Sequence, residues 1–180
     1  GRFGRFPKSN PRVQPTTVPT PITVAVDAMG GDHAPASIVA GALSAVRRLG
    51  ARVLLVGPEA AVRAEIAAQA GGTAALELSV IDAPDVIAMT ESPLAALRRK
   101  RRASIRVATD LVARGEAQAV FTAGHTGAAM LVAHAAFGMI EGVDRPALAV
   151  TFPAPKGPAI LLDAGANVDC RPEHLERFAV

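Results

Sequence analysis

Three polar, glycine-bearing stretches of this chain carry the residue types best suited to chemistry, and each comes at the end of a run of strand-forming residues. They occupy residues 22–35 (ITVAVDAMGGDHAP), 119–130 (AVFTAGHTGAAM) and 159–169 (AILLDAGANVD). Open α/β sheets usually bind their ligands at the carboxyl ends of the strands, where such loops lie. We therefore predict that the three loops gather into a single site.

The second stretch contains TAGHTG and has the features of an anion-binding turn. Gly124 and Gly127 allow close approach of the backbone, and a helix beginning near Thr126 would direct free N–H groups into the turn. Thr122 and Thr126 can add hydroxyl donors, and His125 lies between the glycines. The turn lacks the lysine of a Walker A loop and the glycine spacing of a dinucleotide fingerprint. The alternative is an ordinary strand-to-helix turn in which glycine serves backbone geometry alone.

The first stretch places Asp27, Asp32 and His33 around Gly30 and Gly31. His33 is a candidate for holding or deprotonating a ligand, and Asp27 for orienting it. More simply, Asp32 caps the following helix and Asp27 accepts hydrogen bonds from loop amides. The two carboxylates also argue against a bare anion pocket, because they repel phosphate unless cations offset them.

The third stretch combines Asp163, Gly165, Asn167 and Asp169, a set that either orients a ligand or only holds the loop together. Cys170 follows it and is the only cysteine, which excludes an intrachain disulfide and suits a reducing cytoplasm. We expect Cys170 to be a buried thiol and not a nucleophile, because nothing in the sequence indicates a lowered thiol pKa.

The sharpest charge feature is a run of five basic residues, Arg98, Arg99, Lys100, Arg101 and Arg102. It follows a predicted helix, whose C-terminus favours cations, but its like charges repel one another. A phosphate, an acidic carrier protein or lipid headgroups would relieve that repulsion; the alternative is a solvated face. Nucleic acid is weakly supported, because stacking aromatic residues are lacking nearby.

The composition indicates one globular domain at residues 22–180 after a different tail at residues 1–21. The chain has 180 residues, of which 50% are hydrophobic, and a formal net charge of +3. The tail is rich in proline and arginine, and we expect it to be disordered, with a basic tether to an anionic surface as the alternative. The most apolar run, residues 128–140, is too short to span a membrane. The chain does not begin with methionine and is expected to be processed or incomplete.

The elements that must position the loops alternate between strand and helix. Strands are predicted at residues 22–26, 53–56, 76–82, 117–122, 147–151 and 159–162. Helices are predicted at residues 34–49, with Ile38, Val39, Leu43, Val46 and Leu49 on one face, at residues 104–115, where Ser104 can act as the cap, and at residues 126–140. Further helices are predicted from Ser92-Pro93 and from Pro58 and Pro172 onward. This alternation is typical of a largely parallel sheet covered on both faces. The chain is expected to stop inside the last helix, with part of the fold missing.

Several long motifs resemble, in order, the bacterial phosphate acyltransferases of phospholipid synthesis. They are VAVDAMGGDHAP, ESPLAALRRKRRASI, AVFTAGHTGA, GVDRPALA and LLDAGANVDCRPEHLERFA, and the resemblance covers residues 22–180. Family members continue well past the last residue, so the chain resembles their amino-terminal portion. One departure is His125, where the family usually has asparagine, and Thr122 replaces a serine.

The resemblance implies a three-layer α/β/α sandwich similar to phosphotransacetylases. It implies a cytoplasmic homodimer that is peripherally associated with the inner face of the membrane. At the membrane the homodimer would contact the glycerol-3-phosphate acyltransferase. The implied reaction moves an acyl group from acyl carrier protein to inorganic phosphate, giving acyl phosphate without a cofactor or metal. The alternatives are a short-chain phosphotransacetylase acting on acyl-coenzyme A and a non-catalytic binding fragment.

On this basis the roles expected of the residues divide among the loops. Phosphate is assigned to the TAGHTG turn, that is to Thr122, Gly124, His125, Thr126 and Gly127. Orientation and proton handling are assigned to Asp27 and His33, with Asn167 completing the pocket. The remaining polar and glycine residues form the loops: Gly30, Gly31, Asp32, Asp163, Gly165 and Asp169. The basic run is expected to contact the carrier protein or its phosphopantetheine phosphate.

Overall fold

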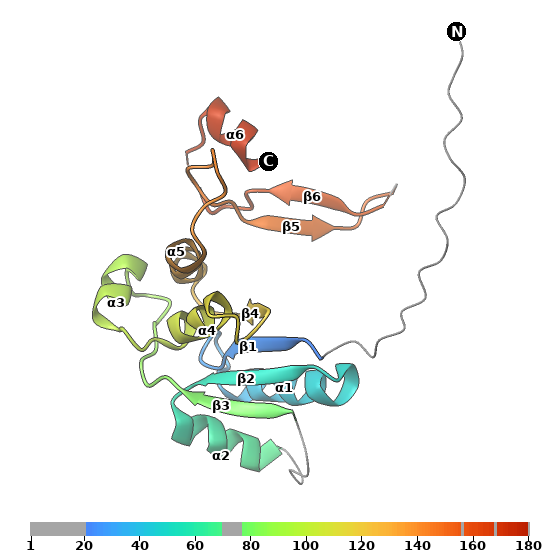
Figure 1. Cartoon of the computed structure of the whole chain (residues 1–180), viewed down its shortest axis with the longest axis vertical. Helices are drawn as coiled ribbons and strands as arrows, with labels where there is room; N and C mark the ends of the chain where they lie inside the picture. The colour runs from blue at the N-terminus through green and yellow to red at the C-terminus, as the bar shows by residue number, and fades with distance from the viewer. Residues whose placement is uncertain (1–20, 70–76, 156, 168, 180) are drawn as a thin grey trace.

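The computed structural model describes residues 21–69, 77–155, 157–167 and 169–179 (Figure 1). The predicted disorder of the tail and the start of the strand predicted at residue 76 therefore lie outside the described residues.

A four-stranded parallel sheet forms the centre of the fold. Its strands are β1 (Thr23–Asp27), β2 (Arg52–Gly57), β3 (Leu78–Asp82) and β4 (Ala119–Phe121), in the order β3-β2-β1-β4. Valine, leucine and isoleucine dominate these strands, as expected of strands covered on both faces. The α/β class and the parallel sheet predicted from the sequence are confirmed.

Helices cover both faces of this sheet and make three layers (Figure 1). On one face, α1 (Ala36–Leu49) and α2 (Glu59–Gln69) pack through side chains that include Val39, Leu43 and Val62, against strand residues such as Leu55. On the other, α4 (Ser104–Ala113) packs against the alternate strand residues Ala25 and Val56. The division follows from the two-residue period of a strand.

Two more helices extend the second face. α3 (Pro93–Arg99) begins at Ser92-Pro93 as predicted, and α5 (Thr126–Phe137) follows β4. Buried residues of α3, α4 and α5 form one apolar cluster, in which Leu97 packs with Ile105 and Val132. This cluster fixes the amino ends of α4 and α5 beside the carboxyl ends of the strands.

The last two predicted strands are present but do not extend the parallel sheet. β5 (Ala149–Phe152) and β6 (Ala159–Leu162) pair only with each other as an antiparallel hairpin, which stands apart from the sheet in Figure 1. Apolar side chains of both strands are exposed. α6 (Pro172–Phe178) follows, and its Arg177 pairs with Asp144 at 2.6 Å.

Local details of the helix ends correct several expectations. α1 begins at Ala36 with Pro35 at the N-cap and no side-chain cap, so Asp32 does not cap it. α4 has Ala103 at its N-cap, so Ser104 is its first residue and not its cap. Within the described residues, no helix combines the length and apolar character needed to cross a membrane.

Candidate functional site

The candidate site lies where β1 and β4 end side by side. The chain runs outward from β1 to β2 and β3 and then returns to place β4 on the other side of β1. This reversal is the topological switch point at which open α/β sheets bind ligands. Because Val26 pairs with Phe121, the residues that follow them, Asp27 in β1 and Thr122 just after β4, lie opposite each other across the junction.

A short hydrogen-bond chain joins the first two predicted loops. The Thr122 hydroxyl donates to Asp27 Oδ2 at 2.8 Å, and the Gly124 N–H donates to that hydroxyl at 3.1 Å. Asp27 Oδ1 accepts from the Met29 N–H at 3.1 Å. Since a hydroxyl has one proton, Thr122 cannot also donate to an anion while it donates to Asp27. In this arrangement the Thr122 hydroxyl joins the two loops, and its role in holding phosphate stays a prediction.

Close backbone contact between the two loops explains two of the glycines. A Cβ atom on Gly30 would lie 2.7 Å from Thr122 Oγ1 and 2.8 Å from the Gly124 nitrogen. A Cβ atom on Gly124 would lie 3.0 Å from Gly30 Cα. Side chains at these positions would therefore push the loops apart, as the sequence-based argument for close approach requires.

A narrow pocket of about 10 Å³, with room for about one water molecule, lies at this junction between the amino ends of two helices. It is lined by Asp27, Met29, Gly30, Ile87, Ser104, Ile105, Gly124, His125 and Ala128. α4 and α5 both begin here, and neither amino end has a side-chain cap. In α5 the Ala129 N–H bonds to His125 O at 3.0 Å, and the N–H groups of residues 126–128 precede that bond. The positive ends of the two helices make the pocket attractive to an anion.

Within the part of the chain that the structure describes, the carboxylate of Asp27 is held by hydrogen bonds and not by an ion pair. Its side chain is 3% exposed, and no arginine or lysine pairs with it among the described residues. The carboxylate instead accepts hydrogen bonds from the Thr122 hydroxyl and the Met29 N–H. Asp27 thus holds the two loops together at the pocket, which it also lines.

Five pocket residues were not singled out from the sequence as site residues, and three of them lie outside the three predicted loops. Ile87, Ser104 and Ile105 come from the segment between β3 and α4, which crosses back over the second face of the sheet. Ser104 was interpreted only as a helix cap. A serine next to a predicted helix start was the available signal, but nothing local indicated which strand end that helix would approach.

The histidine and aspartate of the first loop lie at the surface. Asp32 and His33 are both exposed, and neither lines the narrow pocket. His125 is half-buried, forms the N-cap of α5 and does line the pocket. Among the predicted histidines, His125 is therefore the one that the fold brings to this junction.

The third predicted loop lines a different pocket. That pocket has a volume of about 490 Å³ and is formed by Arg145, Ala166, Asn167, Asp169, Cys170, Arg171 and His174. It shares no lining residue with the narrow pocket. The structure therefore joins the first two loops and leaves the third beside β5, β6 and α6.

Within the third loop, Asp163 acts as a hydrogen-bond acceptor for the backbone. It has φ +63°, and its carboxylate accepts from the N–H groups of Asn167 at 2.9 Å, Ala166 at 3.1 Å and Leu148 at 3.3 Å. Desolvation tends to raise the pKa of Asp163, but the hydrogen bonds together lower that pKa below its ordinary value of 3.8. The Asn167 amide donates to Pro146 O at 3.0 Å. In this chain both side chains hold the loop together.

Cys170 is exposed, so the expectation of a buried thiol is wrong. It lies in the loop before α6 and has no packed layer over it. Its sulfur is 4.0 Å from Asn167 O. Among the described residues, no group of three or more histidine, cysteine, aspartate or glutamate side chains is placed to hold a metal ion.

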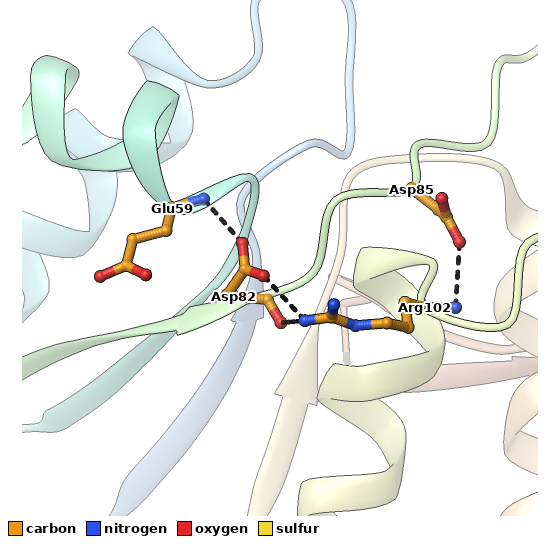
Figure 2. Close-up of polar contacts among 4 residues, drawn as sticks. All are labelled: Glu59, Asp82, Asp85 and Arg102. Atoms are coloured by element: carbon orange, nitrogen blue, oxygen red, sulfur yellow. Dashed lines mark hydrogen bonds and ion pairs between the residues drawn. The ribbon is translucent and has the colours of Figure 1, made fainter.

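The basic run divides into residues with internal partners and residues directed to solvent. The Arg102 guanidinium donates to Asp82 Oδ2 at 2.7 Å and to Asp82 O at 3.1 Å, and the Arg102 backbone N–H donates to Asp85 Oδ2 at 3.0 Å. Figure 2 shows these contacts. Asp82 also accepts from the Glu59 N–H at 3.1 Å. These contacts connect the end of β3 to the amino end of α2 and to the segment before α4.

Lys100 is likewise held within the fold, because it pairs with Glu91 and donates to Val86 O at 2.6 Å. By contrast, Arg98, Arg99 and Arg101 are exposed and have no ion pair within the described residues. The positive charge available to a partner therefore comes from these three arginines and not from the whole run.

The fold places the chain among doubly wound α/β proteins, with a pocket at the switch point of its parallel sheet. The chain belongs to the family described as "Fatty acid synthesis protein", whose model matches residues 22–180. That match leaves out only the tail, and both Asp27 and Thr122 lie within it.

Curated relatives agree in their names. The chain is 50% identical to a protein named "Phosphate acyltransferase" from Desulforamulus reducens over 160 residues, which are 88% of this chain and 47% of that relative. It is 50% identical to one from Nostoc punctiforme (89% and 47%) and 52% identical to one from Anaeromyxobacter dehalogenans (87% and 43%). The chain thus spans about half the length of the curated relatives it matches.

Proposed function

We propose that this chain is the amino-terminal portion of a phosphate acyltransferase that converts acyl-[acyl carrier protein] and inorganic phosphate to acyl phosphate and free carrier protein. The observation that carries the proposal is the junction of Asp27 and Thr122, where two uncapped helix amino ends border one pocket. The names of relatives about half identical to the chain support the same reaction. In the cell, the acyl phosphate would feed glycerol-3-phosphate acylation.

The proposed reaction does not require a strong general acid or base. Phosphate is partly dianionic near neutral pH and is its own nucleophile, so the protein has to hold one phosphate oxygen near the thioester carbonyl and stabilise the oxyanion that forms. We assign phosphate to the N–H groups at Thr126 and Gly127, with His125 beside them. Asp27 and Thr122 position that turn, and Gly124 lets it approach the first loop.

We also propose roles in the site for His33 and Asn167, and each role requires a change from the structure described above. His33 is exposed in this chain, which leaves it accessible for proton handling if a substrate covers the first loop. Asn167 would have to release its hydrogen bond to Pro146 O before its amide could contact a ligand.

The acidic carrier protein would contact the exposed arginines Arg98, Arg99 and Arg101. Opposite charge at an interface rim accelerates encounter and makes it sensitive to salt. A homodimer in the cytoplasm, in peripheral contact with the membrane and its glycerol-3-phosphate acyltransferase, completes the proposal.

The decisive experiment measures acyl phosphate formed from palmitoyl-[acyl carrier protein] and phosphate. It compares this chain with the same chain extended to the length of its relatives, and each is also assayed with acetyl-coenzyme A. We expect turnover of the palmitoyl carrier protein by the extended protein. Turnover of acetyl-coenzyme A alone would indicate a short-chain phosphotransacetylase, and binding of phosphate without turnover of either substrate would indicate a binding module.

A further inference from the structure

A third pocket, larger than the two described above, lies between α3, α4 and α5, apart from the strand ends. Its volume is about 670 Å³, within the roughly 300–1,000 Å³ range of small-molecule sites. It shares no lining residue with the narrow pocket. The lining is Leu94, Leu97, Arg98, Arg101, Arg106, Asp110, Leu131, Val132, His134, Ala135 and Ala136.

The charged part of this lining is positive. Arg98, Arg101 and Arg106 outnumber the one carboxylate, Asp110. Arg106 is partly buried and oriented by a hydrogen bond from its guanidinium to Leu97 O at 3.2 Å. Arg98 and Arg101 have no ion pair within the described residues. Three arginines around one pocket repel one another, and a carboxylate or phosphate group would relieve that repulsion through charge-assisted hydrogen bonds.

The uncharged part of the lining is almost entirely aliphatic. Leu97 and Val132 are buried and form its floor, while Leu94 and Leu131 remain 53% and 37% exposed. Ala135 and Ala136 add small side chains on α5, which leave room above the helix. An alkyl chain placed here would remove apolar surface from water on both sides of the contact.

We propose that this pocket binds a single-chain anionic amphiphile, with its carboxylate or phosphate head at Arg98, Arg101 and Arg106 and its alkyl chain against Leu94, Leu97 and Leu131. The arginines and leucines that line the pocket, contributed by α3 and the residue Arg101 after it, by α4 and by α5, match the two parts of such a ligand. A free phosphate would leave the leucines exposed, and a neutral lipid would leave the arginines without a counterion.

This pocket lies next to the candidate site but is separate from it. Pro93 begins α3 beside the turn, because a Cβ atom on Gly127 would lie 3.2 Å from Pro93 Cγ. From Gly127 to Ala135, α5 rises by about 12 Å. The amphiphile site therefore begins next to the anion turn and extends away from it. The inference does not rest on the proposed acyl transfer, because it concerns binding alone.

The test is calorimetric titration of the whole chain with dodecanoate and with dodecyl phosphate, each below its critical micelle concentration. Acetate and inorganic phosphate serve as heads without tails, and dodecyl maltoside serves as a tail with a neutral head. We expect one amphiphile per chain for the first two probes and at least about tenfold weaker binding for the other three. The comparison of dodecanoate with dodecyl phosphate distinguishes a carboxylate site from a phosphate site.

Matched variants separate the pocket from general basicity. Replacing Arg98 and Arg101 by glutamine should weaken the binding of both amphiphiles about tenfold or more. Arg99→Gln removes a charge from the same run but outside the pocket lining, and should change affinity by less than about twofold. Leu131→Ser should weaken the amphiphiles, while Leu175→Ser, an exposed leucine on α6, should not. Circular dichroism confirms that each variant is folded.

Equal losses for Arg98→Gln/Arg101→Gln and for Arg99→Gln would overturn the proposal, since the arginines would then act only as diffuse charge. So would binding of the short heads as tightly as of the amphiphiles. Cosedimentation with anionic phosphatidylglycerol vesicles, together with no saturable binding below the micelle concentration, would show a membrane-contact surface in place of a ligand pocket.

Discussion

The Thr122 hydroxyl donates to Asp27 Oδ2 at 2.8 Å across the ends of β4 and β1, and joins residues that are 95 positions apart in the chain. The same hydroxyl accepts from the Gly124 N–H at 3.1 Å. One side chain therefore determines the relative position of the first two loops and the direction in which the turn before α5 leaves the sheet.

Replacement of Thr122 by valine should destabilise the fold. The change removes the donor to a buried carboxylate and the acceptor of the Gly124 N–H while keeping the side-chain shape, so we expect a loss of about 1–3 kcal/mol in the free energy of unfolding. Urea denaturation monitored by circular dichroism measures it. Thr122→Ser retains the hydroxyl and should lose far less; equal losses in the two variants would show that the hydroxyl is not what matters.

Gly30→Ala should disturb the junction, whereas Gly41→Ala should not. The new Cβ at Gly30 would lie within 3.0 Å of Thr122, Gly124 and Asp27 atoms, and that at Gly41 has nothing within 4 Å. Gly41 is inside α1, where alanine is better than glycine by about 0.5–1 kcal/mol. We expect the two variants to shift the urea midpoint in opposite directions. A Gly30→Ala protein as stable as the wild type would contradict the close contact of the loops.

Gly127→Val tests the assignment of phosphate to the turn before α5. A Cβ atom there would already lie 3.2 Å from His125 Cε1 and 3.2 Å from Pro93 Cγ, so valine must displace a neighbour at the first turn of the helix. We expect a marked increase in the phosphate concentration needed for half-maximal turnover by the extended protein. Unchanged phosphate dependence in a folded variant would count against the proposed phosphate site.

Some residues of the basic run should contribute to stability and others to partner binding. Arg102→Gln breaks an ion pair whose side chains are 59% and 41% exposed, so we expect a loss of about 0.2–1 kcal/mol in unfolding free energy. Charge reversal of Arg99 and Arg101 should leave stability nearly unchanged but weaken carrier-protein binding and reduce its salt dependence. Surface plasmon resonance at two ionic strengths measures the latter. Unaltered affinity would show that these arginines form only a solvated face.

The carboxylate of Asp163 should titrate at unusually low pH. Its folded pKa is depressed, so its contribution to stability is present above the unfolded pKa and is lost as pH falls through the folded pKa. We expect a ¹³C NMR titration of its side chain to give a midpoint below the ordinary 3.8. Asp163→Asn should reduce the acid-induced loss of stability relative to the wild type. A midpoint at or above the ordinary value would contradict the three backbone hydrogen bonds.

Local sequence patterns were sufficient for most elements of the fold. The apolar period of α1 predicted Val39, Leu43 and Val46 as buried, and Ser92-Pro93 marked the start of α3. Leu49 was also placed on the buried face of α1 but is 78% exposed, because the helix extends past the edge of the packed layer. Such patterns report hydrophobic periodicity and capping, which depend on neighbours a few residues away.

The sequence by itself determined that the chain alternates strands and helices, that glycine-rich polar loops end several strands, and that its motifs resemble one family. Only the tertiary structure decided which loops meet. Placing β4 beside β1 brings Thr122 to Asp27 and Ser104 to the same pocket, while pairing β5 with β6 keeps Asn167 and Asp169 elsewhere. Strand order and register depend on the packing of the whole domain, and no local period encodes them.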